Sequence, residues 1–158
     1  MQFHSPSKGD LPLEQVVDEL IRFVAEQPQS TYRLIIGTDS QTTNSHTHFV
    51  TAIVVHRVGK GGRYYVYDRF ERPIYSLRQK LSHETSQSLE VMIRLKELLL
   101  SRQVLTQFEL EIHVDAGTAG ATRELIRDLV GLVMANGFTA RVKPESFAAS
   151  KVADKYTR

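Results

Sequence analysis

Cysteine is absent from the 158-residue sequence, which excludes disulfide bonds and zinc sites built on thiolates. Its absence is compatible with a reducing cytoplasm, where we expect the protein to reside. Long apolar runs are also missing, and none approaches the roughly 20 residues that a helix needs to cross a bilayer. The first residues are neither basic nor continuously apolar, so we expect no signal peptide.

Composition and charge set wide limits. Apolar residues make up 41% of the chain and charged residues 24%, which is an ordinary balance for a globular protein. The formal net charge of +2 is compatible with an anionic partner and equally with an ordinary surface. Because no internal repeat, low-complexity tract or linker is visible, the sequence predicts a single domain over residues 1–158.

Hydrophobic periodicity predicts an α/β fold. Residues 1–11 are polar and are predicted to be a leader, and residues 12–30 are predicted to contain an amphipathic helix that ends before Pro28. Residues 31–158 are predicted to be the core of the domain. Its expected elements are strands at about 32–38, 49–56 and 64–70, a helix at about 74–102, a strand at about 108–114, a helix at about 119–136, a strand at about 138–142 and a helix at about 146–157.

This order of elements favours a mixed five-stranded sheet with helices on its faces and an extra N-terminal helix. The first three strands can form an antiparallel meander, and the later strands alternate with helices and so favour parallel crossovers. In such sheets, ligands bind at the carboxyl ends of strands near a switch in strand order. Asp39 and Asp115 end the first and fourth predicted strands, so their carboxylates meet at one rim if these strands are parallel neighbours.

Glu84 lies in the long predicted helix, and its position there is informative. At about 100° per residue, Glu84 falls within the apolar stripe of this helix, whereas Glu90 and His83 fall on the solvent side. A carboxylate on a core-facing stripe is costly unless it is paired or binds a cation. The pattern therefore indicates either a metal ligand or the partner of a buried arginine or lysine.

The other candidate acids are Asp39, Asp115 and Asp154, and each has a simpler alternative. Asp39 is also typical of a turn aspartate that binds its own backbone, and Asp115 of a loop aspartate near a helix start. Asp154 lies beside the apolar face of the last predicted helix. There, an exposed pair with Lys151 or Lys155 is nearly as good an interpretation as a metal ligand.

Converging carboxylates without cysteine favour Mg²⁺ or Mn²⁺ over zinc. Two such ions held by shared acids support hydrolysis of a phosphodiester bond. Several polar and basic side chains are candidates for contacting substrate phosphates, although solvation explains each lysine and arginine singly. These candidates are Ser40, Arg123, Lys143, Lys151 and Lys155.

Aromatic and histidine side chains are assigned structural roles. His113 is predicted to be a packed strand residue that could orient Asp115. The aromatic residues of the third predicted strand are assigned to the sheet and core rather than to base stacking. They are Tyr64, Tyr65, Tyr67 and Phe70.

Four short motifs, together with the order of strands and helices over about residues 32–157, carry a family resemblance. The chain resembles the ribonuclease H-like superfamily and, more narrowly, the bacterial YkuK-type ribonuclease H-like family. The motifs are Gly37–Gln41 (GTDSQ), His113–Gly117 (HVDAG), Thr122–Leu125 (TREL) and Ala148–Lys155 (AASKVADK).

The resemblance implies a nuclease-type fold with four metal-binding acids. Two departures, the extra N-terminal helix and the lack of a visible basic handle for RNA/DNA hybrids, leave the substrate class open. Carried over by position, the superfamily's acids fall on Asp39, Glu84, Asp115 and Asp154.

The sequence therefore favours a divalent-metal-dependent nuclease acting on RNA, DNA or a hybrid. A first alternative is a non-catalytic nucleic-acid-binding or scaffold domain with the same fold. A second is a nucleotide-phosphate-binding enzyme, because Gly37–Ser40 and Asp115–Thr118 look somewhat like the phosphate loops of actin-like ATPases. Such ATPases resemble two paired domains, however, and this chain has the length of one.

Overall fold

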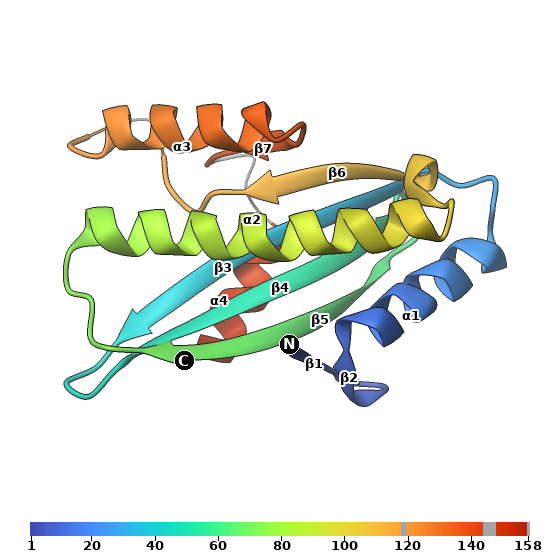
Figure 1. Ribbon diagram of the computed structural model, residues 1–158, viewed down its shortest axis with the longest axis horizontal. Coiled ribbons are helices and arrows are strands. Elements are labelled where there is room, and N and C mark those ends of the chain that lie inside the picture. The colour runs from blue at the N-terminus through green and yellow to red at the C-terminus, as the bar shows by residue number, and fades with distance from the viewer. Residues whose placement is uncertain (118–119, 144–147, 158) are drawn as a thin grey trace.

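A computed structural model gives the fold (Figure 1) and describes residues 1–117, 120–143 and 148–157, without the side chains of four residues of the last helix, Ala148, Ser150, Lys151 and Asp154. Within these residues the strands are β1 (Gln2–Ser5), β2 (Gly9–Pro12), β3 (Tyr32–Thr42), β4 (Thr47–Arg57), β5 (Gly62–Glu71), β6 (Phe108–His113) and β7 (Thr139–Arg141). The helices are α1 (Leu13–Glu26), α2 (Leu77–Ser101), the short 3-10 helix η1 (Leu105–Gln107), α3 (Arg123–Ala135) and α4 (Ala148–Thr157).

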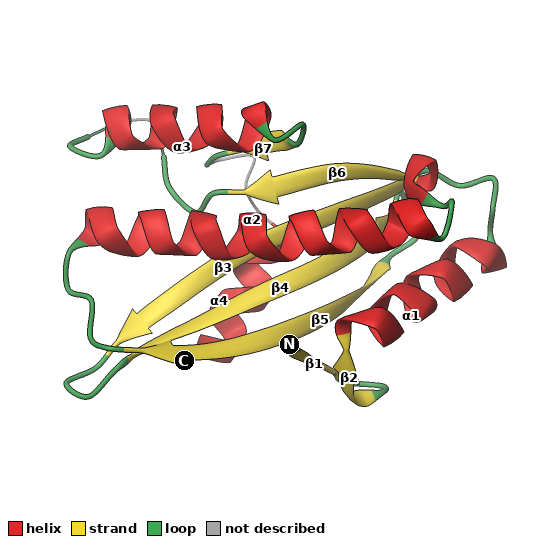
Figure 2. Cartoon of the chain, viewed as in Figure 1, coloured by secondary structure: helices red, strands yellow, loops and turns green. Residues whose placement is uncertain are grey.

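All seven of these strands form one mixed sheet in the order β2-β1-β5-β4-β3-β6-β7. The strands β3, β4 and β5 form an antiparallel meander, and β6 is parallel to both β3 and β7. The predicted α/β class, the meander and the parallel crossovers are confirmed (Figure 2). The predicted number of strands was five, and β1 and β2 account for the difference.

The predicted polar leader, residues 1–11, is instead a β-hairpin. β1 pairs with β2 through a turn before Gly9, whose φ of +70° favours glycine. β1 also pairs with β5 through His4 and Val66. The hairpin is held by alternation, because Phe3 and Ser5 point inward and are buried while their neighbours are exposed. Two inward side chains in a polar segment give too short an alternating pattern for the hairpin to be predicted from the sequence.

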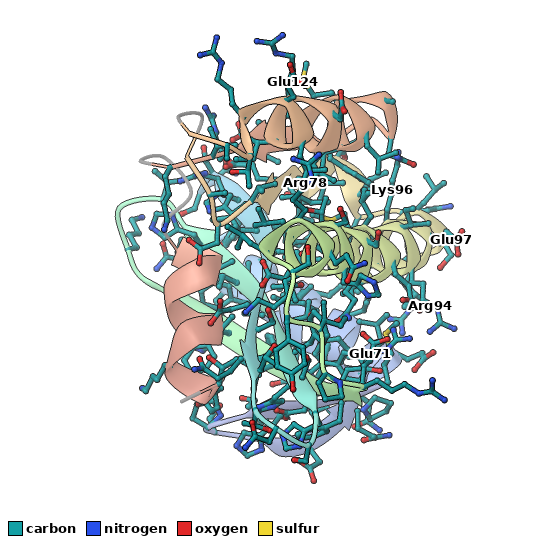
Figure 3. All side chains as sticks on the ribbon, turned by 90° about the vertical axis from the view of Figure 1, so that its left-hand side faces the viewer. Glu71, Arg78, Arg94, Lys96, Glu97 and Glu124 are labelled. Carbon is teal, nitrogen blue, oxygen red and sulfur yellow. The ribbon has the colours of Figure 1, made fainter. Side chains whose placement is uncertain are left out.

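Helices cover both faces of the sheet. α1 and α2 lie on one face and α4 lies behind the other (Figure 1). The fully buried Leu95 and Leu99 of α2 share one apolar cluster with Leu20 of α1 and with Leu34 and Ile36 of β3. Figure 3 shows the charged side chains of α2, such as Arg94 and Glu97, pointing away from the sheet. On the opposite face, a smaller cluster contains Val50, Ala52, Val66 and Ala153.

The boundaries of α2 and β3 position the acids. α2 begins after Ser76, whose side-chain oxygen accepts a hydrogen bond from the backbone N–H of Gln79. β3 is longer than predicted, because its last residues pair with β4 up to Thr42. Asp39 therefore lies within a paired strand, three residues before its end, and not at the end as predicted. In the described part of the chain, no helix has the length and apolar character needed to cross a bilayer.

Candidate active site

The parallel pairing of β3 with β6 brings two candidate acids to one region of the sheet. Gly37 of β3 is level with His113 of β6, and Asp39 and Asp115 lie two residues further along their respective strands. The condition under which the two acids were expected to meet, that these strands are parallel neighbours, is therefore met. Asp115 lies two residues after the end of β6, in the segment that leads toward α3.

Glu84 approaches this region from α2, as the helical pattern predicted. Its residue is only 9% exposed, and one carboxylate oxygen, Oε2, accepts a hydrogen bond from Ser40 Oγ at 2.5 Å. Burial raises the pKa of Glu84 to about 8; the carboxylates of Asp39 and Asp115 add to the increase, while Ser40 and Lys80 oppose it. Among the described residues, no arginine or lysine forms an ion pair with Glu84, so the alternative of a buried cationic partner is not found.

Each of the three acids has its own hydrogen-bond or ion-pair donor. Asp39 Oδ2 accepts from Thr157 Oγ1 of α4 at 2.9 Å, and Asp115 Oδ1 lies 3.2 Å from Lys143 Nζ. Glu84 is held by Ser40. Within the described residues, no three acidic or histidine side chains are yet arranged to hold a metal ion. The three carboxylates are thus close enough to influence one another but are separately paired.

The chemistry of this region nevertheless fits a hard divalent cation. All three acids supply oxygen ligands, the kind that Mg²⁺ and Mn²⁺ prefer. The charges of Asp39 and Asp115 disfavour ionisation of Glu84, and a cation between them would relieve that repulsion. Thr85 Oγ1 is buried without a hydrogen-bond partner in the described structure.

A narrow crevice at the end of β6 connects α2 with the acids. Nδ1 of His113, a second buried atom without a hydrogen-bond partner in the described structure, belongs to a residue that lines this crevice together with Thr85. The crevice has no room for a water molecule in this structure, so these two polar atoms are enclosed by protein. Its lining residues are Thr38, Glu84, Thr85, Ser88, His113, Val114 and Asp115.

A buried ion-pair network fixes β6 beside β3. Arg33 donates through Nε and Nη2 to the two carboxylate oxygens of Glu111, at 2.6 and 2.7 Å. His113 Nε2 donates to the same carboxylate at 3.2 Å. Burial alone would raise the pKa of Glu111, but Arg33 and His113 outweigh it and lower the pKa to about 2. His113 is buried, as predicted for a packed strand histidine, and burial lowers its pKa.

Replacing Arg33 with methionine is expected to destabilise the protein by about 3 kcal/mol, because Glu111 would remain buried without its main partner. Urea unfolding at neutral pH measures the change. Arg102→Met is a matched control, since Arg102 lies 2.7 Å from Asp18 but both side chains are well exposed, and it is expected to cost less than about 1 kcal/mol. Equal losses in the two variants would contradict the role given to the buried pair.

The predicted phosphate-binding residues are distributed unevenly. Ser40 and Lys143 contact the acids directly. Arg123 is the first residue of α3 and is exposed, and Lys155 is exposed on α4. The backbones of Asp154 and Lys151 lie in α4, but their side chains are outside the described residues.

Sequence reasoning missed two threonines of this site. Thr157 follows a polar stretch at the end of the last predicted helix, and nothing in its spacing indicated a contact with Asp39. Thr85 is next to Glu84 and is buried. Its place near the apolar stripe of the long helix was a signal that could have identified it.

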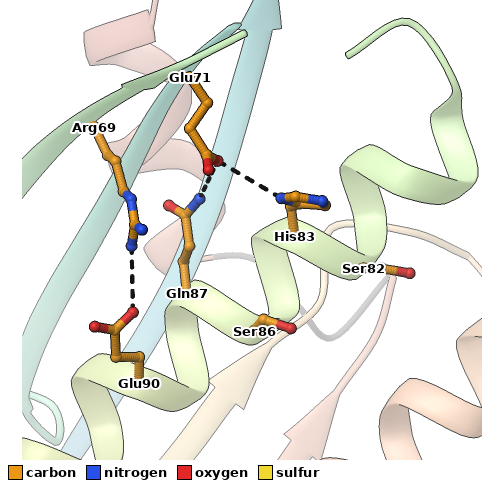
Figure 4. A pocket seen from close by; sticks show the side chains of 7 residues that line it. All are labelled: Arg69, Glu71, Ser82, His83, Ser86, Gln87 and Glu90. Carbon is orange, nitrogen blue, oxygen red and sulfur yellow. Dashed lines mark hydrogen bonds and ion pairs between the residues drawn. The ribbon is translucent and has the colours of Figure 1, made fainter. Parts of the chain in front are cut away.

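A larger polar pocket lies on the other flank of α2, facing β5 (Figure 4). Its charged side chains are paired with one another: Arg69 lies 3.3 Å from Glu90, and Glu71 contacts both His83 and Gln87. Glu90 and His83 are exposed, as the helical pattern predicted. The pocket does not include the candidate acids, and its lining is Arg69, Glu71, Ser82, His83, Ser86, Gln87 and Glu90.

Comparisons with known proteins agree with this fold. The family described as Ribonuclease H-like matches the chain over residues 15–158, a region that contains all four predicted acids. YkuK of Bacillus subtilis (strain 168), described as an uncharacterized protein, is 34% identical to the chain over 166 residues. That alignment covers 99% of the chain and 96% of YkuK.

Proposed function

Since this chain belongs to the ribonuclease H-like family, we propose that it is a divalent-metal-dependent nuclease that hydrolyses phosphodiester bonds in RNA, DNA or a hybrid. The observation that carries the proposal is Glu84. It is buried, burial together with the charges of Asp39 and Asp115 raises its pKa, and it lacks a cationic partner in the described structure. A cation is the partner that this arrangement would stabilise most.

In this proposal, Asp39, Glu84 and Asp115 hold Mg²⁺ or Mn²⁺, and Asp154 is the fourth ligand. When bound, a pair of such ions supplies an activated water and stabilises the leaving oxygen of the phosphodiester. Ser40 orients Glu84 through its hydrogen bond.

The proposed roles of the basic residues concern the substrate backbone. Lys143 now pairs with Asp115, and a metal ion that takes over this carboxylate would free the ammonium group for a substrate phosphate. Arg123, Lys151 and Lys155 are proposed to contact phosphates further along the strand.

Titration with Mn²⁺ tests the metal site directly. We expect Mn²⁺ to raise the melting temperature of the wild-type protein, because an ion that binds the folded state stabilises it by mass action. At a free concentration of about 100 times Kd, the stabilisation would be about 2.7 kcal/mol. Differential scanning fluorimetry measures the shift.

Asp39→Asn should lose most of this shift, whereas Asp10→Asn should keep it, because Asp10 is an exposed aspartate in the terminal hairpin. An unchanged wild-type melting temperature over the whole titration would argue against the metal site.

A second candidate function is a nucleic-acid-binding domain that does not cleave. The separate pairing of the three acids with Thr157, Ser40 and Lys143 favours it. It predicts salt-dependent binding without cleavage in either Mg²⁺ or Mn²⁺. The nucleotide-phosphate enzyme is not proposed, because Gly37–Ser40 lies within the paired strand β3 and not at a helix start.

A further inference from the structure

Phe70 of β5 is 61% exposed, although the sequence had been interpreted as placing it in the sheet and core. Its ring is stacked on His48 of β4, with centroids 4.4 Å apart and planes 4° apart. The ring of His46 meets Phe70 edge-on at 5.2 Å. His48 Nε2 is bonded to Asp68 Oδ1 at 2.6 Å, which fixes the imidazole. We call His46, His48 and Phe70 the aromatic platform.

The aromatic platform lies on the same face of the sheet as Asp39. Asp39 is level with Val50 and Asp68 across β3, β4 and β5, and the next row on this face contains His48 and Phe70. Residues two apart on a strand share a face. The platform is therefore one row beyond Asp39 toward the β3–β4 turn and two strands away, within roughly 15 Å.

Arg72 and Tyr75 follow Phe70 closely in the sequence, whereas Arg78 belongs to α2, which covers the other face of the sheet. Arg72 and Arg78 lie in and beside the connection from β5 to α2; both are exposed, and neither forms an ion pair with any described residue. Arg78 is labelled in Figure 3. Tyr75, in the same connection, is 71% exposed. Arg72 thus places a positive charge two residues after Phe70, and a cation near an exposed ring suits a ligand that combines phosphates with aromatic faces.

We propose that the aromatic platform binds an unpaired base of a single-stranded nucleic acid, with Phe70 as the stacking surface. The inference rests on the proposed function and names its substrate class. A base inside a duplex is stacked on its neighbours and offers no free face, whereas a single strand or a frayed end does. Since stacking on Phe70 supplies no hydrogen-bond pattern, binding should be tolerant of sequence.

Two strands of the same length test the stacking: an oligothymidylate of about 12 nucleotides and a matched strand with abasic sites. Binding is measured by fluorescence anisotropy in EDTA, where no strand can be cut. We expect Phe70→Ala to weaken binding of the oligothymidylate about tenfold and to leave binding of the abasic strand unchanged. Phe70→Trp should retain the affinity for oligothymidylate.

Met134→Ala is the matched control, because Met134 lies on α3 and is 62% exposed; it should change neither affinity. Thermal melting checks that the exposed substitutions leave the fold intact. Equal oligothymidylate binding by wild type and Phe70→Ala overturns the inference, as does an equal loss for both strands. Cleavage is measured in parallel in Mn²⁺. If the wild-type protein cleaves a strand although the stacking inference fails, the proposed nuclease function still stands. A wild-type protein that neither binds nor cuts any strand overturns both.

Discussion

Asparagine in place of Asp39 or Asp115 is expected to lower nucleic-acid cleavage by about a thousandfold or more while the protein stays folded. Each substitution removes one negative charge and one strong oxygen ligand from the proposed metal site. Metal ions contribute several kcal/mol to stabilising such transition states, and each 1.36 kcal/mol corresponds to tenfold in rate. Asparagine has nearly the same shape as aspartate, so the fold should tolerate the change.

The measurement is a cleavage assay on single-stranded RNA, single-stranded DNA and a hybrid, each with Mg²⁺ and with Mn²⁺. Glu109→Gln is a suitable control, because Glu109 is an exposed acid on β6, the strand that precedes Asp115; its activity should match the wild type. Full cleavage by Asp39→Asn or Asp115→Asn would contradict the nuclease proposal. Cleavage by no variant, combined with salt-dependent binding, would favour the non-catalytic domain.

Glu84→Gln is expected to stabilise the metal-free protein in alkaline buffer by a few kcal/mol. The pKa of Glu84 is about 8 in the folded protein, above its ordinary value of 4.5, mainly because the side chain is buried. Between these values the unfolded chain releases the proton more readily, so the wild type loses stability as pH rises from about 4.5 to about 8. Glutamine has no proton to release, and its side chain can still accept the hydrogen bond from Ser40.

Urea unfolding in EDTA at about pH 4 and about pH 9 measures how the free energies of unfolding of the wild type and of Glu84→Gln depend on pH. The variant and the wild type should be nearly equal at the lower pH and should differ at the higher one. Glu90→Gln, an exposed site on the same helix, should show little difference at either pH. If Glu84→Gln gave the same change at both pH values, the raised pKa of Glu84 would be wrong. With Mn²⁺ present, the order should reverse, because the variant lacks one proposed ligand.

Sequence pattern placed Glu84 correctly because a long helix repeats its apolar stripe many times. α2 is 25 residues long, so its apolar stripe recurs over several turns. The order of elements likewise indicated the antiparallel meander and the parallel crossovers, but it left open whether β3 and β6 are neighbours. The pattern failed where a few residues decide the structure. Residues 1–11 form a hairpin that is held by two inward side chains. Phe70 lies near the end of β5 and is exposed, although the composition of that strand is typical of a core strand.

The sequence indicated the acids of the candidate site but not the hydrogen bonds and ion pairs that these acids form. Thr157 lies 118 residues from Asp39 along the chain, and only the packing of α4 on β3 brings them together. The length of β3 depends on pairing of its polar residues with β4, which local propensity does not reveal. Residue type and spacing thus selected the acids, whereas tertiary packing determines which donors hold them.

The pairing of Arg33 with Glu111 has a consequence for the order of folding. The two residues are 78 positions apart and join a meander of neighbouring strands to the part of the sheet that follows α2. The meander can assemble locally, whereas the parallel pairing must first close a long loop. Asp39 and Asp115 lie just beyond this junction, so their proximity is acquired late. A nascent chain that has folded only its meander would carry Asp39 alone of the proposed ligands, and it should neither retain a divalent ion nor cleave a nucleic-acid strand.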